Sequence, residues 1–330
     1  MKKAYIYISF WSFLIGVIYT TTIACETAID LKIKDFEKNL VLNAVFEPDS
    51  SLILNLQWTQ ELGNPPPDGE DIGDILDSWV LLKDGNGGVI DTAQLCYNYY
   101  YNNNTIIPDY CSLEKNEATY VLPNLKFDYG KEYQIEILRT DGFSLNASCQ
   151  TPLDFSIEFD PLDTFSTEFS GAKVFDFPVV IKDNPNENNF YIIEARSREV
   201  YSQYDDDYQA VGLYCLDPSC ENSDIARQED QYQRIFINDN EFNGVDHLLI
   251  LKASKLFLEF PKIDGAERFL EVNISSVSED LYKYYKGFER HERSYGTDIF
   301  AQPVQLHSNV SNELGILGAK VTKEVSFRVD

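Results

Sequence analysis

Three histidines, His247, His291 and His307, are the side chains best suited to acid–base chemistry near neutral pH. None of them has the spacing of a nucleophile's partner or of a zinc ligand. The sequence contains no Gly-x-Ser-x-Gly elbow and no glycine-rich phosphate loop. His291 stands between Arg290 and Glu292 in a segment with helical spacing, which is typical of a surface residue. We therefore expect no catalytic residue and no enzyme.

Two acidic segments carry oxygen atoms that are potential calcium ligands. Residues 205–207 are three consecutive aspartates, and residues 238–244 alternate asparagine with acidic side chains and end in glycine. Calcium needs six or more converging oxygens. Neither segment has the Asp-x-Asp-x-Asp-Gly spacing that brings them together. We expect no metal site and no other cofactor.

A tyrosine- and asparagine-rich stretch between Cys96 and Cys111 is the best candidate for a binding loop. Tyrosine offers a large, rigid, amphipathic ring, and asparagine offers adaptable hydrogen bonding, so both are frequent in recognition loops. The tyrosines of this candidate loop are Tyr97, Tyr99, Tyr100, Tyr101 and Tyr110. A second candidate surface carries Tyr201, Tyr204, Tyr208 and Tyr214. The chain holds 21 tyrosines, so compositional bias is the alternative explanation.

Six cysteines in a chain that reads as exported predict disulfides. We expect the local pairs Cys96–Cys111 and Cys215–Cys220, since both flank loop-like sequence. A disulfide across the tyrosine-rich stretch would also pre-organise it for binding. Cys149 lies in an alternating, strand-like segment and is most simply a buried free thiol. A pair between Cys149 and Cys25 is the alternative.

The first residues predict export and attachment to a membrane. Residues 1–24 begin with two lysines, continue as an uncharged, mostly apolar run and end in small residues, which is the pattern of a signal peptide. Cys25 follows directly and predicts lipidation, so residues 25–39 would form a lipidated N-terminus and linker. Thr22 departs from the leucine that is usual before a lipidated cysteine. A plain cleaved signal peptide is the alternative.

Composition limits the partners of this chain. With 27 basic and 54 acidic residues, its formal net charge is −27. Such a charge repels nucleic acid and anionic headgroups, so we expect no nucleic-acid partner. No later segment has the ~20 consecutive apolar residues that a membrane-spanning helix needs. The expected membrane contact is therefore the N-terminal lipid.

Short strand-like runs separated by turn signals predict a β-sandwich over residues 40–152, of immunoglobulin-like or transthyretin-like type. A proline-rich loop at residues 64–69 and a glycine-rich turn at residues 83–88 separate some of these runs. The expected strands are 40–45, 52–58, 79–82, 89–90, 120–122, 133–138 and the segment around Cys149.

Residues 153–330 predict a second β-rich domain that carries one helix, so the chain is mainly β. Ser276 and Glu279 have capping-box spacing, and apolar side chains follow at helical intervals, which predicts a helix near residues 277–293. The expected strands are 155–159, 174–181, 190–196, 248–251, 269–274 and 320–329.

The segments 300–303 and 309–319 (Phe-Ala-Gln-Pro, then Asn-Val-Ser-Asn-Glu-Leu-Gly-Ile-Leu-Gly-Ala) resemble the closing motif of the Bacteroidetes domain-of-unknown-function family 4249. Further resemblance is found at residues 25–31, 183–191 and 282–288, so it covers nearly the whole chain. These motifs are structural rather than catalytic. Glu313 stands where glycine is common in the family, and Leu317 where phenylalanine is common.

The resemblance implies a cell-envelope lipoprotein, often encoded beside a TonB-dependent outer-membrane receptor. Glu26, next to Cys25, resembles the signal that exports such lipoproteins to the cell exterior. We therefore expect a surface-exposed outer-membrane lipoprotein, lipid-anchored and non-catalytic, that captures or gates a ligand for such a receptor in nutrient uptake. A structural or adhesive surface lipoprotein without a transported ligand is one alternative. A glycan hydrolase that uses carboxylates is another.

Overall fold

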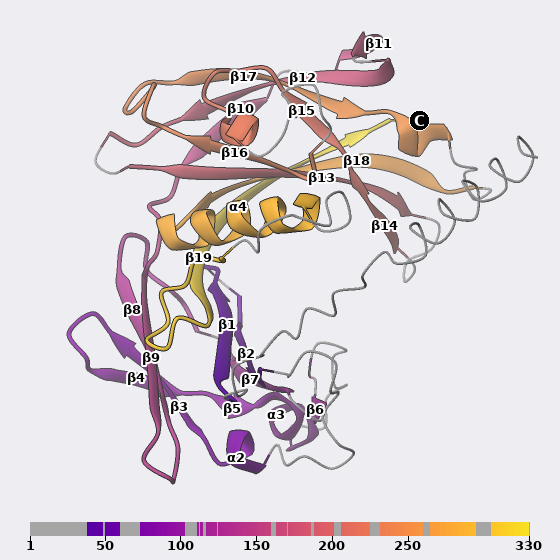
Figure 1. Cartoon of the computed structure of the whole chain (residues 1–330). Coiled ribbons are helices and arrows are strands. Elements are labelled where there is room, and N and C mark those ends of the chain that lie inside the picture. Colours follow the sequence, from indigo (N-terminus) through magenta and orange to yellow (C-terminus); the bar gives the residue numbers. More distant parts are fainter. Residues whose placement is uncertain are drawn as a thin grey trace, which may run out of the picture. The chain divides into compact units, whose positions relative to one another are not determined.

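The computed structural model describes residues 38–48, 50–59, 73–102, 111, 113–114, 117–123, 125–159, 163–169, 171–185, 188–200, 206–224, 232–259, 265–294 and 305–329 (Figure 1). The expected signal peptide, Cys25 and the linker up to residue 37 lie outside the described residues. Residues 38–330 form one compact unit. None of the helices among the described residues combines the length and apolar character needed to cross a membrane.

The largest sheet has ten strands. They are β1 (Leu40–Phe46), β2 (Leu52–Trp58), β5 (Gln94–Leu95), β6 (Leu113–Glu114), β7 (Glu117–Leu122), β13 (Phe190–Val200), β14 (Asp206–Val211), β16 (Arg234–Asn238), β18 (Glu267–Val277) and β19 (Gly315–Arg328). Their order is β14-β13-β18-β19-β1-β2-β7-β5, with β16 paired to β13 and β6 paired to β7.

Two smaller sheets complete the mainly β fold. The four-stranded sheet has the order β4-β3-β8-β9 and contains β3 (Trp79–Asp84), β4 (Val89–Thr92), β8 (Glu132–Leu138) and β9 (Ser144–Gln150). The five-stranded sheet has the order β10-β12-β17-β15, with β11 paired to β12. It contains β10 (Ser156–Phe159), β11 (Asp163–Phe169), β12 (Ala172–Lys182), β15 (Leu213–Cys215) and β17 (His247–Ser254). The expectation of a mainly β chain is confirmed.

The helices are few and mostly short. They are the α-helices α2 (Gly73–Leu76), α3 (Cys96–Asn102) and α4 (Glu279–Ser294) and the 3-10 helices η1 (Glu221–Asp224) and η2 (Leu256–Glu259). α4 occupies the segment in which the sequence predicts a helix. Its first turn carries Glu279 and Asp280 and its last turn carries Arg293, which suits the helix dipole. α3 is a correction, because the sequence predicts a loop there.

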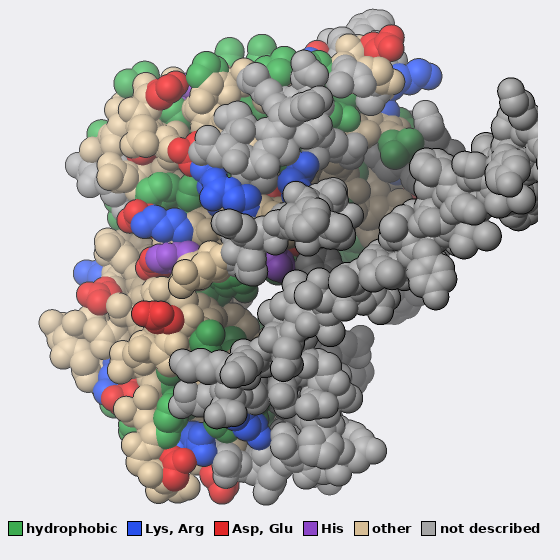
Figure 2. Space-filling view, viewed as in Figure 1, with side chains coloured by type: hydrophobic (Ala, Val, Ile, Leu, Met, Phe, Trp, Pro, Cys, Tyr) green, Lys and Arg blue, Asp and Glu red, His purple; other side chains and the backbone are tan. Residues whose placement is uncertain are grey.

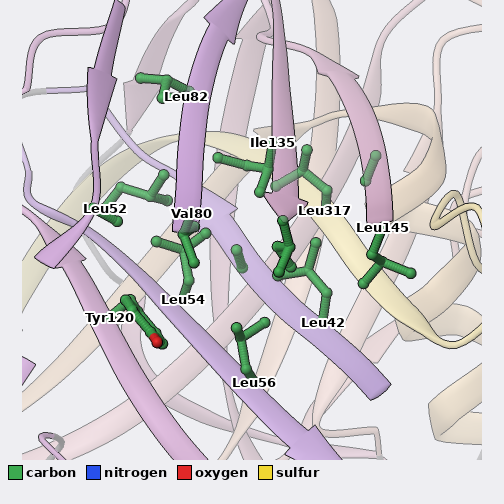
Figure 3. Close-up of a cluster of buried hydrophobic side chains, with 14 of the residues drawn as sticks. Leu42, Leu52, Leu54, Leu56, Val80, Leu82, Tyr120, Ile135, Leu145 and Leu317 are labelled. Carbon is green, nitrogen blue, oxygen red and sulfur yellow. The ribbon is translucent and has the colours of Figure 1, made fainter. Parts of the chain in front are cut away.

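The first hydrophobic core lies between part of the ten-stranded sheet and the four-stranded sheet (Figure 3). β1 and β2 alternate strictly between buried and partly exposed residues, so Leu42 and Leu54 point into this core. Val80 from β3 and Ile135 from β8 meet them from the opposite sheet. Burial of each such side chain contributes roughly 1.5–3 kcal/mol. The packing is sandwich-like, as the sequence predicts.

The second core lies between another part of the ten-stranded sheet and the five-stranded sheet. Ile193 from β13 and Leu270 from β18 meet Phe177 from β12 and Leu251 from β17, all with no exposed surface. A third and smaller cluster joins α4 to the opposite face of the ten-stranded sheet. The ten-stranded sheet is therefore covered on one face by β-strands and, over β13, β18 and β19, by α4 on the other.

One long strand connects these parts. Residues 315–319 of β19 pair in parallel with β1, and residues 320–328 pair antiparallel with β18. β19 thus changes partner halfway along its length. Through it the ten-stranded sheet combines strands from both sides of residue 152, where the sequence places a domain boundary. That boundary stays a prediction.

The expected disulfides are present. Cys96–Cys111 joins the residue after β5 to a residue shortly before β6, and both of these strands pair with β7. Cys215–Cys220 closes a short turn after β15. Cys149 forms no disulfide and is buried, as expected.

Cys149 should resist alkylation in the native protein. Burial raises the pKa of its thiol to about 12, so almost no reactive thiolate exists near neutral pH. We expect iodoacetamide at pH 8 to leave the Cys149 peptide unmodified until urea is added, when modification becomes complete. Peptide mass spectrometry separates this cysteine from the others. Rapid labelling without urea would contradict its burial in β9.

Candidate functional site

Helix α4 is the element around which the candidate site is built. Leu281 and Tyr282 turn toward the sheet and pack against Phe236 and Ile316. The approach is close, because a Cβ atom added at Gly318 would lie only 2.7 Å from the Leu281 side chain. The buried side of the helix is thereby fixed on the sheet, and its two flanks each border a groove.

The first groove, here called the polar groove, has a volume of about 920 Å³. Lys283, Lys286 and Arg290 line it from α4, and Figure 2 shows lysine and arginine side chains gathered over this region. Lys286 Nζ lies 2.9 Å from Glu221 Oε2, and the Tyr282 hydroxyl donates to the same oxygen at 2.6 Å. Acidic partners therefore offset much of this positive charge.

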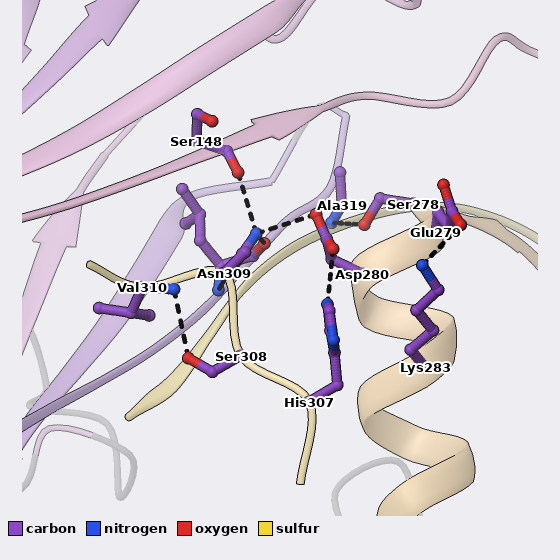
Figure 4. Close-up of polar contacts among 11 residues, drawn as sticks. Ser148, Ser278, Glu279, Asp280, Lys283, His307, Ser308, Asn309, Val310 and Ala319 are labelled. Carbon is purple, nitrogen blue, oxygen red and sulfur yellow. Dashed lines mark hydrogen bonds and ion pairs between the residues drawn. The ribbon is translucent and has the colours of Figure 1, made fainter. Parts of the chain in front are cut away.

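Asn309 ties three elements together at one end of the polar groove (Figure 4). Its amide nitrogen donates to the carbonyl oxygens of Ser148 in β9 (2.9 Å) and Leu317 in β19 (2.8 Å), and to Asp280 Oδ2 in α4 (3.3 Å). Its amide oxygen accepts the Leu317 N–H at 2.9 Å. The asparagine therefore acts as a structural clamp.

His307 stands beside this clamp and lines the polar groove. Its Nε2 lies 2.6 Å from Asp280 Oδ1, while Asn309 contacts the other oxygen of the same carboxylate. Both oxygens of Asp280 are thus engaged. The arrangement orients His307 at the edge of the groove, and within the described part of the chain the hydrogen-bond partner of its imidazole is a carboxylate and not a nucleophile.

The second groove, here called the aromatic groove, has a volume of about 580 Å³, which is in the range of small-molecule sites. Tyr284, Tyr285 and Phe288 line it from α4, and all three are partly exposed. Burial raises the pKa of both tyrosines above the ordinary value, so their hydroxyls stay protonated at neutral pH. The α4 side of this groove is therefore uncharged and largely apolar.

Two asparagines line the same groove from the sheet. Asn43 in β1 and Asn55 in β2 stand directly opposite each other in the strand register. The Asn55 amide oxygen accepts a hydrogen bond from the Thr119 hydroxyl at 3.1 Å. The Asn43 amide oxygen is buried and has no hydrogen-bond partner among the described residues. A buried acceptor without a donor is costly, so a rotation of the Asn43 amide that brings this oxygen to a donor in the groove would be favourable.

The charged groups around the aromatic groove are paired. The Arg234 guanidinium stacks on the Tyr285 ring at 4.9 Å, and its Nε donates to Glu194 Oε1 at 2.8 Å. Lys320 Nζ lies 3.6 Å from Glu47 Oε2. The groove thus combines aromatic rings, free amide groups and locally neutralised charge.

The tyrosines of the candidate binding loop lie mostly in α3. Tyr97 is exposed there, and it lines neither groove. The backbone of Tyr99, Tyr100 and Tyr101 is helical, but their side chains lie outside the described part of the structure, as does the whole of Tyr110. A binding role for this segment stays a prediction.

The second candidate surface is only partly described. Tyr208 is exposed on β14, with the Arg196 guanidinium 4.5 Å from its ring. Tyr214 is a correction, because it is only 5 % exposed and packs against Phe169 at 5.2 Å, so it does not belong to a surface. Tyr201 and Tyr204 lie outside the described residues.

His247 takes part in a compact polar cluster beside the Cys215–Cys220 disulfide. Its Nε2 lies 3.2 Å from Asp217 Oδ1 and 3.3 Å from Ser219 Oγ, and Ser219 donates to the same Asp217 oxygen at 2.6 Å. A catalytic triad needs one imidazole nitrogen for the hydroxyl and the other for the carboxylate. Here one nitrogen faces both groups, so the cluster stabilises the turn.

The two acidic segments differ in what the structure shows. In residues 238–244, Asp239 is buried and accepts the Asn189 N–H at 2.8 Å, which is a structural contact. Residues 205–207 are only partly described. Among the described residues no group of three or more histidine, cysteine, aspartate or glutamate side chains is placed to hold a metal ion.

Sequence reasoning missed the aromatic groove. One signal was available: Asn43 and Asn55 each interrupt an otherwise apolar run at a position that alternation places on the outer face. The helical spacing of Tyr284, Tyr285 and Phe288 predicts one side of a helix, but it does not reveal that this side borders a groove.

The closing motif at residues 309–319 has a structural role throughout. Asn309 clamps three elements, the Asn312 amide donates to the Leu40 carbonyl oxygen at 2.6 Å, and Gly315 and Gly318 allow close backbone and helix packing. Glu313, where the family resemblance expects glycine, has a positive φ of 63°. Glycine adopts such a φ without strain.

Comparison with known proteins agrees with this motif. A search of curated proteins finds no match to the chain. The sequence profile of the family described as "Domain of unknown function (DUF4249)" matches residues 26–325. Because this match covers nearly the whole sequence, the chain belongs to the DUF4249 family.

Proposed function

We propose that this protein is a surface-exposed outer-membrane lipoprotein that captures or gates a ligand for a TonB-dependent receptor in nutrient uptake. The aromatic groove carries the ligand-binding part of this proposal. It has the volume of a ligand site, three aromatic side chains and a buried amide oxygen without a partner. The role is one of binding and not of catalysis.

Other features support the location. The two disulfides suit a protein that folds outside the reducing cytoplasm. The signal-peptide pattern and Cys25 support a lipid anchor. The association with a TonB-dependent receptor rests on the family resemblance alone.

A structural or adhesive role is the second candidate. Leu248 and Ile250 on β17 are 54 % and 55 % exposed, in the part of this strand that pairs with β12 and lies beyond its pairing with β15. Exposed apolar side chains in a row are frequent at protein–protein interfaces. This surface would suit attachment to another surface protein without any transported ligand.

The proposed lipid anchor at Cys25 leads to a direct prediction. Replacing Cys25 with serine removes the only acylation site we propose, so the protein should move from the membrane fraction to the soluble fraction. Fractionation and intact-mass analysis measure both effects. A serine variant that still sediments with outer membranes, together with a wild-type mass without acyl chains, would disprove the lipoprotein assignment.

The receptor partnership needs a separate experiment. The wild-type protein is extracted from native membranes in gentle detergent, and its partners are identified by mass spectrometry. A TonB-dependent receptor recovered with it in stable proportion supports the uptake role. Recovery of other surface proteins without a receptor supports the adhesive alternative. The Leu248→Ser, Ile250→Ser double variant should abolish the second type of recovery and leave the first unchanged.

A further inference from the structure

We propose that the aromatic groove binds a neutral saccharide. This inference rests on the proposed role in ligand capture and names the chemical class of the ligand. It is carried by three properties of the groove: free amide groups on one wall, aromatic rings on the other, and charges that are already paired.

The amide wall matches the chemistry of hydroxyl groups. The Asn43 amide oxygen is buried and has no donor among the described residues, so a rotation of this amide toward a hydroxyl group in the groove would satisfy it. The oxygen of the adjacent Asn55 accepts from Thr119, which leaves the Asn55 NH₂ group as a donor without a bond to the described residues. An acceptor and a donor stand side by side, because the two residues are opposite in the register. A hydroxyl group is both donor and acceptor, so a sugar's hydroxyl edge can satisfy both amides.

The aromatic wall matches the other side of a sugar ring. Tyr284, Tyr285 and Phe288 line the groove, and Arg234 already stacks on the Tyr285 ring, so Tyr284 and Phe288 are the rings we expect to contact the sugar. A pyranose has an apolar face of C–H bonds that stacks on aromatic rings, while its hydroxyls point outward from its edge. Aromatic rings have few rotatable bonds, so they offer this surface at a low cost in conformational entropy.

Charge and backbone pairing argue against other ligands. Arg234 and Lys320 already contact Glu194 and Glu47, so an anionic ligand would have to compete with these carboxylates. An extended peptide is bound most readily at an open strand edge. β1 is paired with β2 and β19, and β2 with β1 and β7, so neither offers such an edge. Recognition in this groove is left to side chains, as it is for a saccharide.

The test begins with the full-length wild-type protein in detergent on an array of neutral and acidic oligosaccharides from plant, microbial and animal sources. We expect at least one neutral oligosaccharide to bind. Its affinity is then measured by titration calorimetry for wild type, for three groove variants and for one control variant. Asn43→Ala, Asn43→Leu and the double variant Tyr284→Ala, Phe288→Ala should each weaken binding at least tenfold.

Two controls separate binding from folding. Tyr129→Ala removes an exposed tyrosine that lies outside both grooves and outside the candidate binding loop, so it should leave the affinity unchanged. Asn43→Leu should keep or raise the melting temperature, because it removes a buried acceptor that has no partner. A stable Asn43→Leu protein that no longer binds sugar would therefore identify a binding residue and not a structural one.

The inference is overturned if no neutral oligosaccharide binds, if only acidic ones bind, or if the Asn43 variants bind as tightly as wild type. Its failure is distinguishable from that of the proposed function. If the protein binds sugar but no receptor is recovered with it, the saccharide inference holds and the receptor role is disproved. If a receptor is recovered with the protein but no sugar binds, the receptor role holds and the saccharide inference is disproved.

Discussion

A Gly315→Ala variant is expected to lose most of its stability. Gly315 has a φ of +95°, and a Cβ atom at this position would lie 2.0 Å from the carbonyl oxygen of Leu42 and 2.7 Å from its carbonyl carbon. These are backbone atoms of the paired strand β1, so no side chain can move aside. Relief of the clash requires β1 and β19 to separate. We expect a loss of more than ~4 kcal/mol in the free energy of unfolding, measured by urea denaturation.

Gly142→Ala is the matched control. Gly142 has a similar φ of +89°, but no atom of the described residues lies within 4 Å of its added Cβ. Only the backbone strain remains there, so we expect a loss of about 1–2 kcal/mol. If the two variants lost equal stability, the close approach of β19 to β1 at Gly315 would be wrong.

Replacement of Asn309 by leucine is expected to cost about 3 kcal/mol. The side chain makes four hydrogen bonds, to Ser148, Asp280 and both backbone groups of Leu317. Each such bond contributes about 1 kcal/mol net to the free energy of unfolding. A buried partner group that is left without a hydrogen bond lowers the stability by more than this. Because the site is partly exposed, water can replace some of the lost hydrogen bonds, so the total loss of stability stays below the sum of the costs for fully buried partners. Thermal and urea unfolding monitored by circular dichroism measure the change.

Asn146→Leu provides the comparison for this variant. Asn146 lies on the same strand as Ser148, is exposed, and forms its contacts through its backbone. We expect a change within ~0.5 kcal/mol. Equal losses at the two asparagines would show that β9 tolerates leucine poorly and that the clamp contributes little.

The strands with regular alternation could be predicted from the sequence. The expected strand 52–58 has the bounds of β2, because every second residue from Leu52 to Trp58 is buried. The helix α4 could also be predicted, since its apolar spacing and acidic first turn are local signals. The expected capping box was wrong, because Ser276 lies in β18 and α4 begins only at Glu279. These elements depend on neighbours in sequence, and local patterns describe such neighbours well.

The first half of β19 shows where local patterns fail. The sequence predicts a strand only from residue 320, because Gly315 and Gly318 normally interrupt strands. In the structure these glycines are needed where β19 approaches Leu42 and Leu281 closely. A glycine that weakens a strand locally is thus required by a distant partner, and no local pattern contains that partner.

The candidate binding surface depends on contacts of the same non-local kind. The aromatic groove needs the register that places Asn43 opposite Asn55 and the packing that sets α4 beside them. The prediction that Tyr214 belongs to a binding surface was wrong for a related reason. Its grouping with Tyr201, Tyr204 and Tyr208 rests on tyrosine content alone, whereas Phe169 packs against it and β15 is paired with β17 in the fold. Composition describes a segment, but only tertiary packing decides which side chains remain accessible.

The change of partner along β19 has a consequence for how this chain acquires its fold. Asn312 bonds Leu40, 272 residues earlier, and the parallel pairing of β1 with β19 follows directly after it. The central pairing of the large sheet is therefore unable to form until nearly the whole sequence is available. Such high contact order slows folding and leaves strand edges open to wrong partners meanwhile. Until β19 is in place, the first core also lacks Leu317 and Ala319, so the large sheet and this core are completed together by residues 315–319.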